Sequence, residues 1–285
     1  MDKEAVAIVT GASRGAGAGI ARALGAMGYL VYVTGRTVKP GVAPLPGTIN
    51  ATVEAIKQAG GRAVAVQIDH QDDQQVSALF SQIRKETGRL DILVNNATFL
   101  HDELITPGKF WERPLELVDI LDVGLRSAYV ASWYAAPLMV ETGNGLIAFT
   151  SSFGSACYMH GPAYGAQKAG LDKFAADMAV DLKEDKIAAL SIWMGPLLTE
   201  RSARSIKERP DQYAEIMKYA ETPEFTGQII GTLHQSPRRM ELTGQTLIGA
   251  EIALELGLTD KDGKQPPSYR AMLGEPRIAH HAIIR

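Results

Sequence analysis

The chain has 285 residues, of which 46% are hydrophobic and 21% charged, so it is long enough for a buried core and too balanced for disorder or a fibre. The 29 basic and 32 acidic residues give a net charge of −3 without a dominant basic block, which argues against nucleic acid or an anionic membrane as a partner. One cysteine, Cys157, cannot form an intramolecular disulfide, and no apolar run approaches the roughly 18 residues of a membrane span. Such cysteine usage fits a reducing cytoplasm, which is the expected location, and the first residues read as a strand and not as a signal peptide.

Short apolar runs rich in β-branched residues predict the strands. Between them, apolar residues recur three and four positions apart, which predicts helices at Ile20–Met27, Val53–Gln58 and Val76–Arg84. The predicted strands are Ala5–Thr10, Leu30–Thr34, Ala63–Asp69, Leu90–Asn95, Leu146–Ser151, Ala188–Met194 and a short seventh at Gln245–Ile248.

Alternation of strand and helix indicates a doubly wound α/β fold of the Rossmann type with a mostly parallel, seven-stranded sheet. We find no repeat or composition break, so residues 1–285 are expected to form a single domain. Proline and glycine make residues 39–47 a predicted loop, residues 196–225 read as a loop or mobile cap, and a C-terminal extension begins near residue 258.

A glycine-rich turn follows the first predicted strand and precedes a helix. In this position glycines let the backbone approach a pyrophosphate, and the helix N-terminus offers free N–H groups to it, although glycines also simply permit tight turns. The residues expected to contact a dinucleotide here are Gly11, Ser13, Arg14, Gly15, Ala16 and Gly17.

The residues after the second predicted strand discriminate between cofactors. NAD sites in this fold usually carry an acid there, whereas this chain has Arg36. Guanidinium groups bind phosphate bidentately, so Arg14 and Arg36 are expected to clamp a 2′-phosphate, unless both are ordinary surface arginines. The expected cofactor is NADP(H).

A tyrosine and a lysine are four residues apart in the predicted helix Pro162–Leu182. This spacing places Tyr164 and Lys168 on one helix face, where the ammonium would lower the phenol pKa from about 10 toward a range useful for proton exchange. A core or surface tyrosine is the alternative. Ser151 precedes Tyr164 by 164 minus 151, or 13 residues, and is expected to bind the substrate oxygen, with Ser152 as the close competitor.

Together these motifs resemble those of the short-chain dehydrogenase/reductase superfamily. The similarity covers about residues 5–250 and includes the turn from Thr10 to Gly17, the Asn95-Asn96-Ala97 motif, and Ser151, Tyr164 and Lys168 as active-site residues. Residues 124–140 and 257–267 are similar to one carbonyl reductase group within the superfamily.

The resemblance implies further contacts with the cofactor. Asp69 with His70 would meet the adenine, Asn96 and Ala97 would face the ribose, and Tyr164 and Lys168 would also contact the cofactor. Gly195, Leu197 and Thr199 would hold the nicotinamide carboxamide. Asp69 is equally suited to cap the following helix.

Two positions depart from the family pattern. Met194-Gly195-Pro196 stands where a Pro-Gly pair is usual, and Gly124 stands where an asparagine usually completes the catalytic tetrad. The second departure puts the proton relay in doubt, although glycine keeps the main-chain carbonyl that would bind a relay water. Replacing Gly124 with asparagine is therefore expected to change turnover by less than about tenfold.

The predicted function is NADPH-dependent reduction of a ketone or aldehyde, with Tyr164 as proton donor. The rival is a catalytically silent dinucleotide sensor or scaffold. No metal site is expected from the spacing of the six histidines, and Cys157 is either a small apolar filler or a reactive thiol. Residues 98–105, 153–159 and 196–209 suggest a small, moderately apolar substrate, and the family suggests a homodimer or homotetramer.

Overall fold

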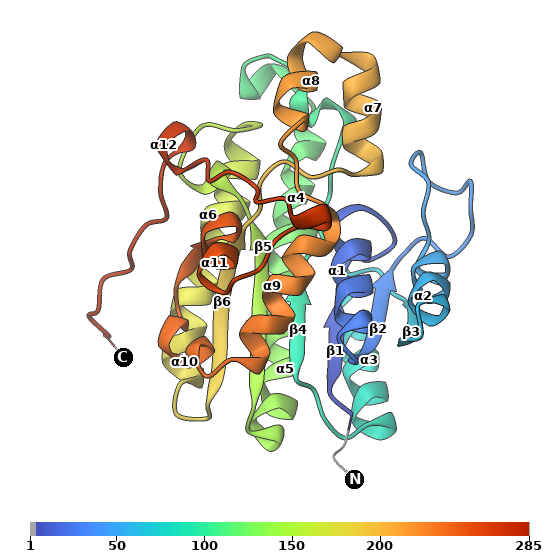
Figure 1. Cartoon of the computed structure of the whole chain (residues 1–285), viewed down its shortest axis with the longest axis vertical. Coiled ribbons are helices and arrows are strands. Elements are labelled where there is room, and N and C mark those ends of the chain that lie inside the picture. Colours follow the sequence, from blue (N-terminus) through green and yellow to red (C-terminus); the bar gives the residue numbers. More distant parts are fainter. Residues whose placement is uncertain (1–3, 285) are drawn as a thin grey trace.

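Seven apolar segments form one parallel sheet in the computed structural model, which describes residues 4–284 (Figure 1). The strand order is β3-β2-β1-β4-β5-β6-β7, which confirms the predicted α/β class and all seven predicted strands. Their bounds are β1 Val6–Val9, β2 Leu30–Gly35, β3 Arg62–Gln67, β4 Ile92–Asn95, β5 Gly145–Ser151, β6 Ile187–Trp193 and β7 Thr246–Ile248.

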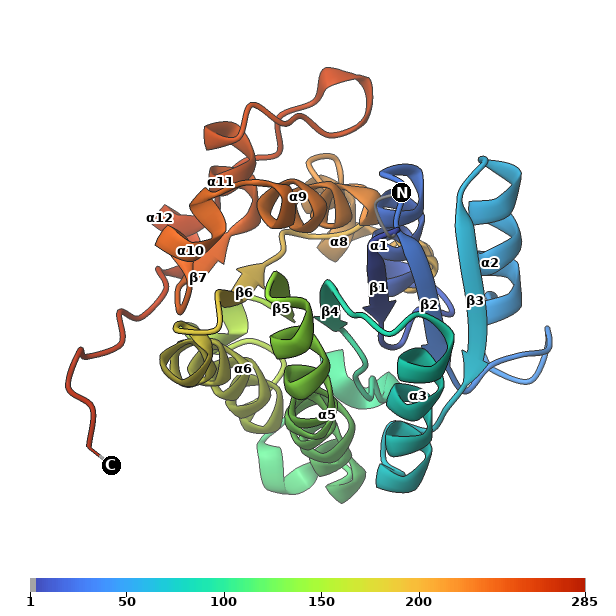
Figure 2. The ribbon, with the colours of Figure 1, turned by 90° about the horizontal axis from the view of Figure 1, so that it is seen from below.

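Helices cover both faces of the sheet (Figure 2). One apolar core lies between the sheet and α1, α2, α9 and α11, and a second lies between the sheet and α3, α5 and α6. This two-sided burial explains why the strands are apolar throughout instead of alternating. The helices are α1 Gly15–Ala26, α2 Ile49–Gln58, α9 Pro223–Gln235, α11 Gly249–Glu255, α3 Asp73–Glu86, α5 Ser127–Thr142 and α6 Pro162–Leu182, with the short α4 Asp119–Leu121, α10 Arg238–Leu242 and α12 Arg270–Leu273.

The chain order reverses at the carboxyl ends of β1 and β4. From β1 the chain proceeds to β2 and β3 on one side, and from β4 it proceeds to β5, β6 and β7 on the other. Ligands of open α/β sheets bind at such a switch point, because the loops there diverge and leave a crevice. The predicted site residues follow β1 to β6 or lie at the start of α6, so they converge on this edge.

The predicted cap is not a loop. Residues 196–225 contain two helices, α7 Glu200–Glu208 and α8 Pro210–Met217, above the carboxyl ends of the strands (Figure 1). No residue within either helix is fully buried, and the mixed charge of this segment is what predicted a loop. Residues 39–47 form a loop, as expected.

The C-terminal extension packs on the base of the cap. Asp260 accepts a hydrogen bond from the Thr222 backbone N–H at 2.7 Å, and the Lys264 ammonium donates to the Lys218 carbonyl at 3.1 Å. Tyr269 contacts Phe153, with ring centroids 6.2 Å apart, in a small apolar cluster that also contains Trp193. The extension therefore stabilises the segments that flank the site.

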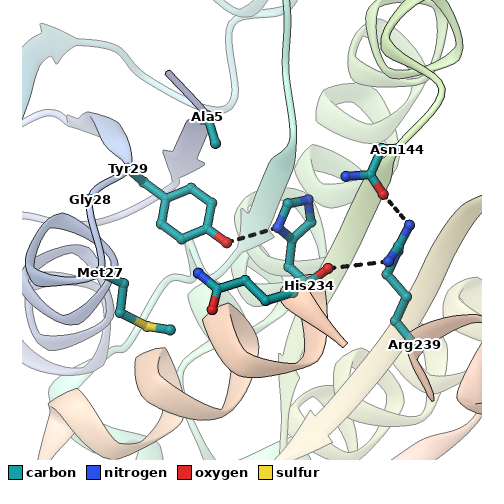
Figure 3. Close-up of a pocket in the computed structure, with 8 residues that line it drawn as sticks. Ala5, Met27, Gly28, Tyr29, Asn144, His234 and Arg239 are labelled. Carbon is teal, nitrogen blue, oxygen red and sulfur yellow. Dashed lines mark hydrogen bonds between the residues drawn. The ribbon is translucent and has the colours of Figure 1, made fainter. Parts of the chain in front are cut away.

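A polar hollow of 320 Å³ lies at the opposite, amino end of the sheet, lined by Tyr29, Asn144, His234 and Arg239 among others (Figure 3). Tyr29 Oη lies 2.8 Å from His234 Nδ1, and Arg239 donates to the Asn144 amide oxygen. Burial raises the pKa of Tyr29 to about 12 and lowers that of His234, so the pair is neutral near pH 7. Residues 4–284 contain no helix that is both long and apolar enough to cross a membrane.

Candidate active site

The backbone of the glycine turn after β1 lies very close to the backbone of neighbouring segments. Gly11 has a φ of +65°, and a Cβ there would lie 2.8 Å from the Ala97 backbone. A Cβ on Gly17 would lie 2.4 Å from the Gly11 carbonyl oxygen and 2.5 Å from Asn96 Nδ2. The turn thus needs glycine at both positions to bring its backbone against the loop after β4. It leaves the start of α1 facing the switch point of the sheet.

Asn96 and Thr10 hold this turn. The Asn96 amide donates to the Thr10 and Gly11 carbonyls at 2.9 and 3.2 Å, and the Thr10 hydroxyl accepts from the Asn96 and Ala97 N–H groups at 2.9 Å. The Asn96 side chain is therefore committed to the turn. The predicted contact of Asn96 with a cofactor ribose stays a prediction.

The two arginines expected at the cofactor phosphate differ in their surroundings. Arg14 donates to the Pro46 and Gly47 carbonyls at 2.9 Å and to the Thr37 hydroxyl at 3.2 Å, so its guanidinium organises the 37–47 loop. Arg36 has 61% of its side chain exposed and lies 3.7 Å from Asp69. Of the pair, Arg36 therefore has the more exposed and less constrained guanidinium.

Asp69 and His70 do not act together. His70 is 4% exposed and lies 2.8 Å from the Thr34 hydroxyl, and burial lowers its pKa to about 4, so it is a neutral residue of the interior. Its contact with the adenine stays a prediction. Asp69 lies at the surface beside Arg36. The alternative that Asp69 caps the next helix is wrong, because Asp72 accepts from Gln74 N and Gln75 N at the start of α3.

Tyr164 and Lys168 lie on the first two turns of α6, as the spacing predicts. The Tyr164 hydroxyl is 2.9 Å from Ser152 Oγ, and Lys168 Nζ donates to the Thr150 carbonyl at 3.1 Å. Ser151 is fully buried, and its hydroxyl donates to the Lys168 carbonyl at 3.3 Å. The geometry therefore favours Ser152 over Ser151 as the serine beside the tyrosine.

Burial is the largest cause of the pKa shifts of both Tyr164 and Lys168. It raises the pKa of Tyr164, an effect that the Ser152 hydrogen bond opposes, and it lowers the pKa of Lys168 to about 8. The direction for Tyr164 differs from the sequence-based expectation, because Lys168 Nζ is 5.4 Å from the ring centroid and is bonded to a backbone carbonyl. A buried phenol is a neutral proton donor at pH 7.

Asp172 is a further, half-buried carboxylate one helical turn beyond Lys168. It accepts from the Ser191 hydroxyl at 2.6 Å and from Trp193 Nε1 at 2.9 Å. Burial raises its pKa, while its charge raises that of Lys168. Because Trp193 contacts Phe153, with centroids 5.0 Å apart, Asp172 links the lysine helix to the loop that carries Ser152.

The loop after β6 contains the other expected cofactor residues. The Gly195 N–H donates to Glu221 Oε1 at 3.2 Å, Leu197 forms a parallel bridge with Glu221, and Thr199 caps α7 through Ser202 N. Glu221 is 1% exposed, and burial raises its pKa to about 7. This buried acid was not predicted from the sequence. It holds the backbone of the loop in place through the Gly195 N–H.

Stability should depend on pH through Glu221. Its folded pKa of about 7 lies above the ordinary value of 4.5, so between these pH values the unfolded chain releases a proton that the folded protein keeps. The free energy of unfolding is then lost as pH rises through this window, by up to about 3 kcal/mol. Urea unfolding of wild type and Glu221→Gln at pH 5 and pH 8 should show that the free energy of unfolding of the variant, relative to that of wild type, is higher at pH 8 than at pH 5. A stability difference that is the same at both pH values would contradict this assignment.

Gly124 lies in a π-helical turn, Asp122–Arg126, at the start of the α5 segment. A Cβ on Gly124 would lie 2.2 Å from Gln167 Nε2 and 3.0 Å from the Thr98 hydroxyl oxygen. Gln167 is 1% exposed and donates to that hydroxyl at 3.3 Å. An amide from α6 thus fills the space beside Gly124, a pairing that the sequence alone could not reveal.

This packing adds a stability cost to Gly124→Asn. The new side chain needs the space that the Gln167 amide fills, so Gln167 must leave Thr98, and we expect a loss of about 1 kcal/mol in the free energy of unfolding, the cost of one hydrogen bond. Gly124→Asn/Gln167→Ser should recover most of that loss, because serine vacates the space. Denaturant unfolding of both variants measures this. The interpretation would be wrong if Gly124→Asn alone matched wild type in stability.

Two further residues near Tyr164 were not predicted. The His160 ring lies edge-on to Tyr164 with centroids 5.0 Å apart, and Arg113 bonds the His160 carbonyl at 3.2 Å and the Leu104 carbonyl at 2.6 Å. Arg113 therefore ties the segment after β4 to the segment before α6. Of the expected substrate contacts, Phe153 is buried, whereas Leu100 and Leu198 remain exposed.

Comparison with known proteins places the chain in a family. Residues 5–210 match the family model for short chain dehydrogenases, and the chain belongs to this family of oxidoreductases, which use nicotinamide dinucleotides. It is 38% identical over 278 residues to human dehydrogenase/reductase SDR family member 1, covering 94% of this chain and 86% of that protein. The mouse protein of the same name is 37% identical over the same length. Both matches confirm that the chain resembles this member of the family.

More distant relatives share the fold. A 3-oxoacyl-[acyl-carrier-protein] reductase of Synechocystis is 29% identical over 85% of this chain and 93% of its own. A solved structure from Sinorhizobium meliloti, described provisionally as a short-chain alcohol dehydrogenase, superimposes with a TM-score of 0.74 at 27% identity and covers 87% of this chain and 95% of its own.

Proposed function

We propose that this protein is an NADPH-dependent reductase of ketones or aldehydes. The observation that carries the proposal is the Tyr164 hydroxyl, held 2.9 Å from Ser152 on the same helix face as the buried Lys168. A bound reduced nicotinamide supplies hydride to the carbonyl carbon. The protein must then position the carbonyl and supply one proton to its oxygen.

Each residue of the site has a distinct task in this proposal. Tyr164 donates its proton to the carbonyl oxygen as negative charge develops there. Ser152 donates a hydrogen bond to the same oxygen and fixes its place, a role first expected for Ser151. Lys168 stabilises the phenolate that remains and contacts the cofactor ribose. Asp172 holds the Trp193 indole N–H, and its charge stabilises the Lys168 ammonium.

The cradle fits a phosphorylated dinucleotide. The turn excludes any Cβ at Gly11 and Gly17, so backbone N–H groups of Ser13, Gly15 and Ala16 can approach a pyrophosphate. Arg36 is exposed after β2 in the place where an acid would favour NAD, and it would bind a 2′-phosphate, with Arg14 shaping the adjoining loop. Asp69, Ala97, Gly195, Leu197 and Thr199 complete the proposed cofactor contacts.

A silent dinucleotide sensor on the same fold is the second candidate, suggested by Gly124. Gln167 supplies an amide beside Gly124, and the π-turn keeps its backbone next to α6, so the departure from the family pattern leaves the site polar and packed. This packing favours an active reductase over a catalytically silent dinucleotide sensor.

We also propose a homo-oligomer of a cytoplasmic, single-domain chain. The outer faces of α5 and α6 expose Trp133, Tyr129, Val140 and Val180, and aromatic side chains so exposed on neighbouring helices are typical of a subunit contact. Sedimentation velocity measures the size of the assembly.

The direct test of the proposed function is turnover. Purified protein with NADPH and a panel of ketones, aldehydes and quinones should consume NADPH in the presence of at least one moderately apolar carbonyl. Tight NADPH binding without consumption across the panel would favour the sensor.

A further inference from the structure

The N-termini of α1 and α7 are connected by the carboxylate of Glu200. Gly15 is the first residue of α1 and Glu200 the first residue of α7, and Glu200 Oε2 accepts a hydrogen bond from the Gly15 N–H at 2.9 Å. The α1 helix has no acidic residue in its own first turn, and its N-cap residue, Arg14, makes no side-chain capping bond. Its capping acid therefore comes from 185 positions further along the chain.

This contact uses a donor that the proposed cofactor needs. Pyrophosphate binds the free N–H groups at the start of the helix after the glycine turn, and a carboxylate satisfies the same groups with the same sign of charge. The Glu200 carboxylate and a bound pyrophosphate would also repel each other. Both cannot hold the Gly15 N–H well at the same time.

The α7 helix is attached in a way that allows it to move. None of its nine residues is buried, and it contacts the segment after β4 through polar groups, with Arg201 donating to the Leu100 carbonyl at 3.0 Å and Arg204 lying 3.6 Å from Asp102. A cavity of 790 Å³, lined by Gly15, Glu200 and Gln228 among others, lies beside it. Elements held by such contacts open at low free-energy cost.

We propose that Glu200 is an internal substitute for the cofactor pyrophosphate, which must displace its carboxylate from Gly15 before the dinucleotide can bind. This inference rests on the proposed function. Release of Glu200 frees one end of α7, while Arg201 and Arg204 keep the other contacts with the 100–105 segment. Cofactor binding is thereby weakened and coupled to the position of the cap over the substrate.

The test compares Glu200→Gln with Glu215→Gln, which removes the same charge from the neighbouring helix α8, where Glu215 is highly exposed. NADPH fluorescence titration should give a dissociation constant about tenfold lower for Glu200→Gln than for wild type, because one charge-assisted hydrogen bond no longer has to be broken. Glu215→Gln should match wild type. Adenosine 2′-monophosphate, which lacks a pyrophosphate, should bind all three proteins alike.

A second variant at position 200 separates the effect of a carboxylate on the Gly15 N–H from an effect on the stability of the protein. Glu200→Asp keeps the charge on a shorter side chain that does not reach Gly15, so it should also bind NADPH more tightly than wild type. Equal or weaker NADPH binding by both Glu200 variants would overturn the proposal while leaving the reductase function intact. Failure of the wild type to bind NADPH at all would overturn the proposed function, and this inference with it.

Discussion

Replacing Tyr164 by phenylalanine should lower carbonyl reduction by roughly 10²- to 10⁴-fold while NADPH affinity stays within a few-fold of wild type. The phenol proton is needed in the transition state but contributes little to holding the cofactor in the ground state. Phenylalanine keeps the ring beside His160 and removes only the hydroxyl that meets Ser152. Steady-state turnover and NADPH titration of the same preparation measure the two effects.

The matched control is Tyr219→Phe, which removes the same hydroxyl from a tyrosine that is 56% exposed between α8 and α9 and lies outside the expected substrate contacts. It should behave as wild type. Near-normal turnover by Tyr164→Phe on a genuine substrate would show that another group donates the proton. The same assay decides the serine assignment, since Ser152→Ala should slow turnover more than Ser151→Ala.

Replacing Arg36 by aspartate should erase or invert a preference for NADP(H) over NAD(H). A charge-assisted bidentate contact with the 2′-phosphate contributes roughly 1.5–3 kcal/mol, or about one to two decades in affinity, and aspartate would favour the ribose hydroxyl of NAD instead. Because the Arg14 guanidinium is bonded to the 37–47 loop, Arg36 should carry most of this discrimination. Dissociation constants for NADPH and NADH measure it.

The control for this variant is Arg62→Asp, which makes the same charge change at the amino end of the adjacent strand, where Arg62 pairs with Glu4. It should leave the cofactor preference unchanged. Equal affinities of the wild type for NADPH and NADH would remove the basis of the cofactor assignment.

The architecture was predictable because its signals are local. Strands buried on both faces require continuous apolar runs, and a helix-starting proline at Pro162 and regular spacing marked the whole of α6 correctly. The short polar helices α7 and α8 contain no fully buried residue, and Ile216 packs only at the edge of the cluster around Phe153, so the apolar spacing that marks the other helices is weak there.

The site was predictable only in part, because its finer geometry depends on contacts between distant segments. Consecutive residues at a strand end point in opposite directions, so spacing alone could not decide between Ser151 and Ser152. The amide of Gln167 beside Gly124 and the carboxyl of Glu221 behind Gly195 come from elements that only the tertiary fold brings together. The acid at the start of α1 was hidden for the same reason.

Transfer of an isotopic label tests the central claim most directly. Wild-type protein is incubated with a carbonyl from the panel and NADPH carrying deuterium at its transferable position, and the product alcohol is analysed by mass spectrometry. The account predicts an alcohol that carries the deuterium, formed by wild type and nearly absent with Tyr164→Phe. Saturating NADPH binding without labelled alcohol from any ketone or aldehyde would contradict it.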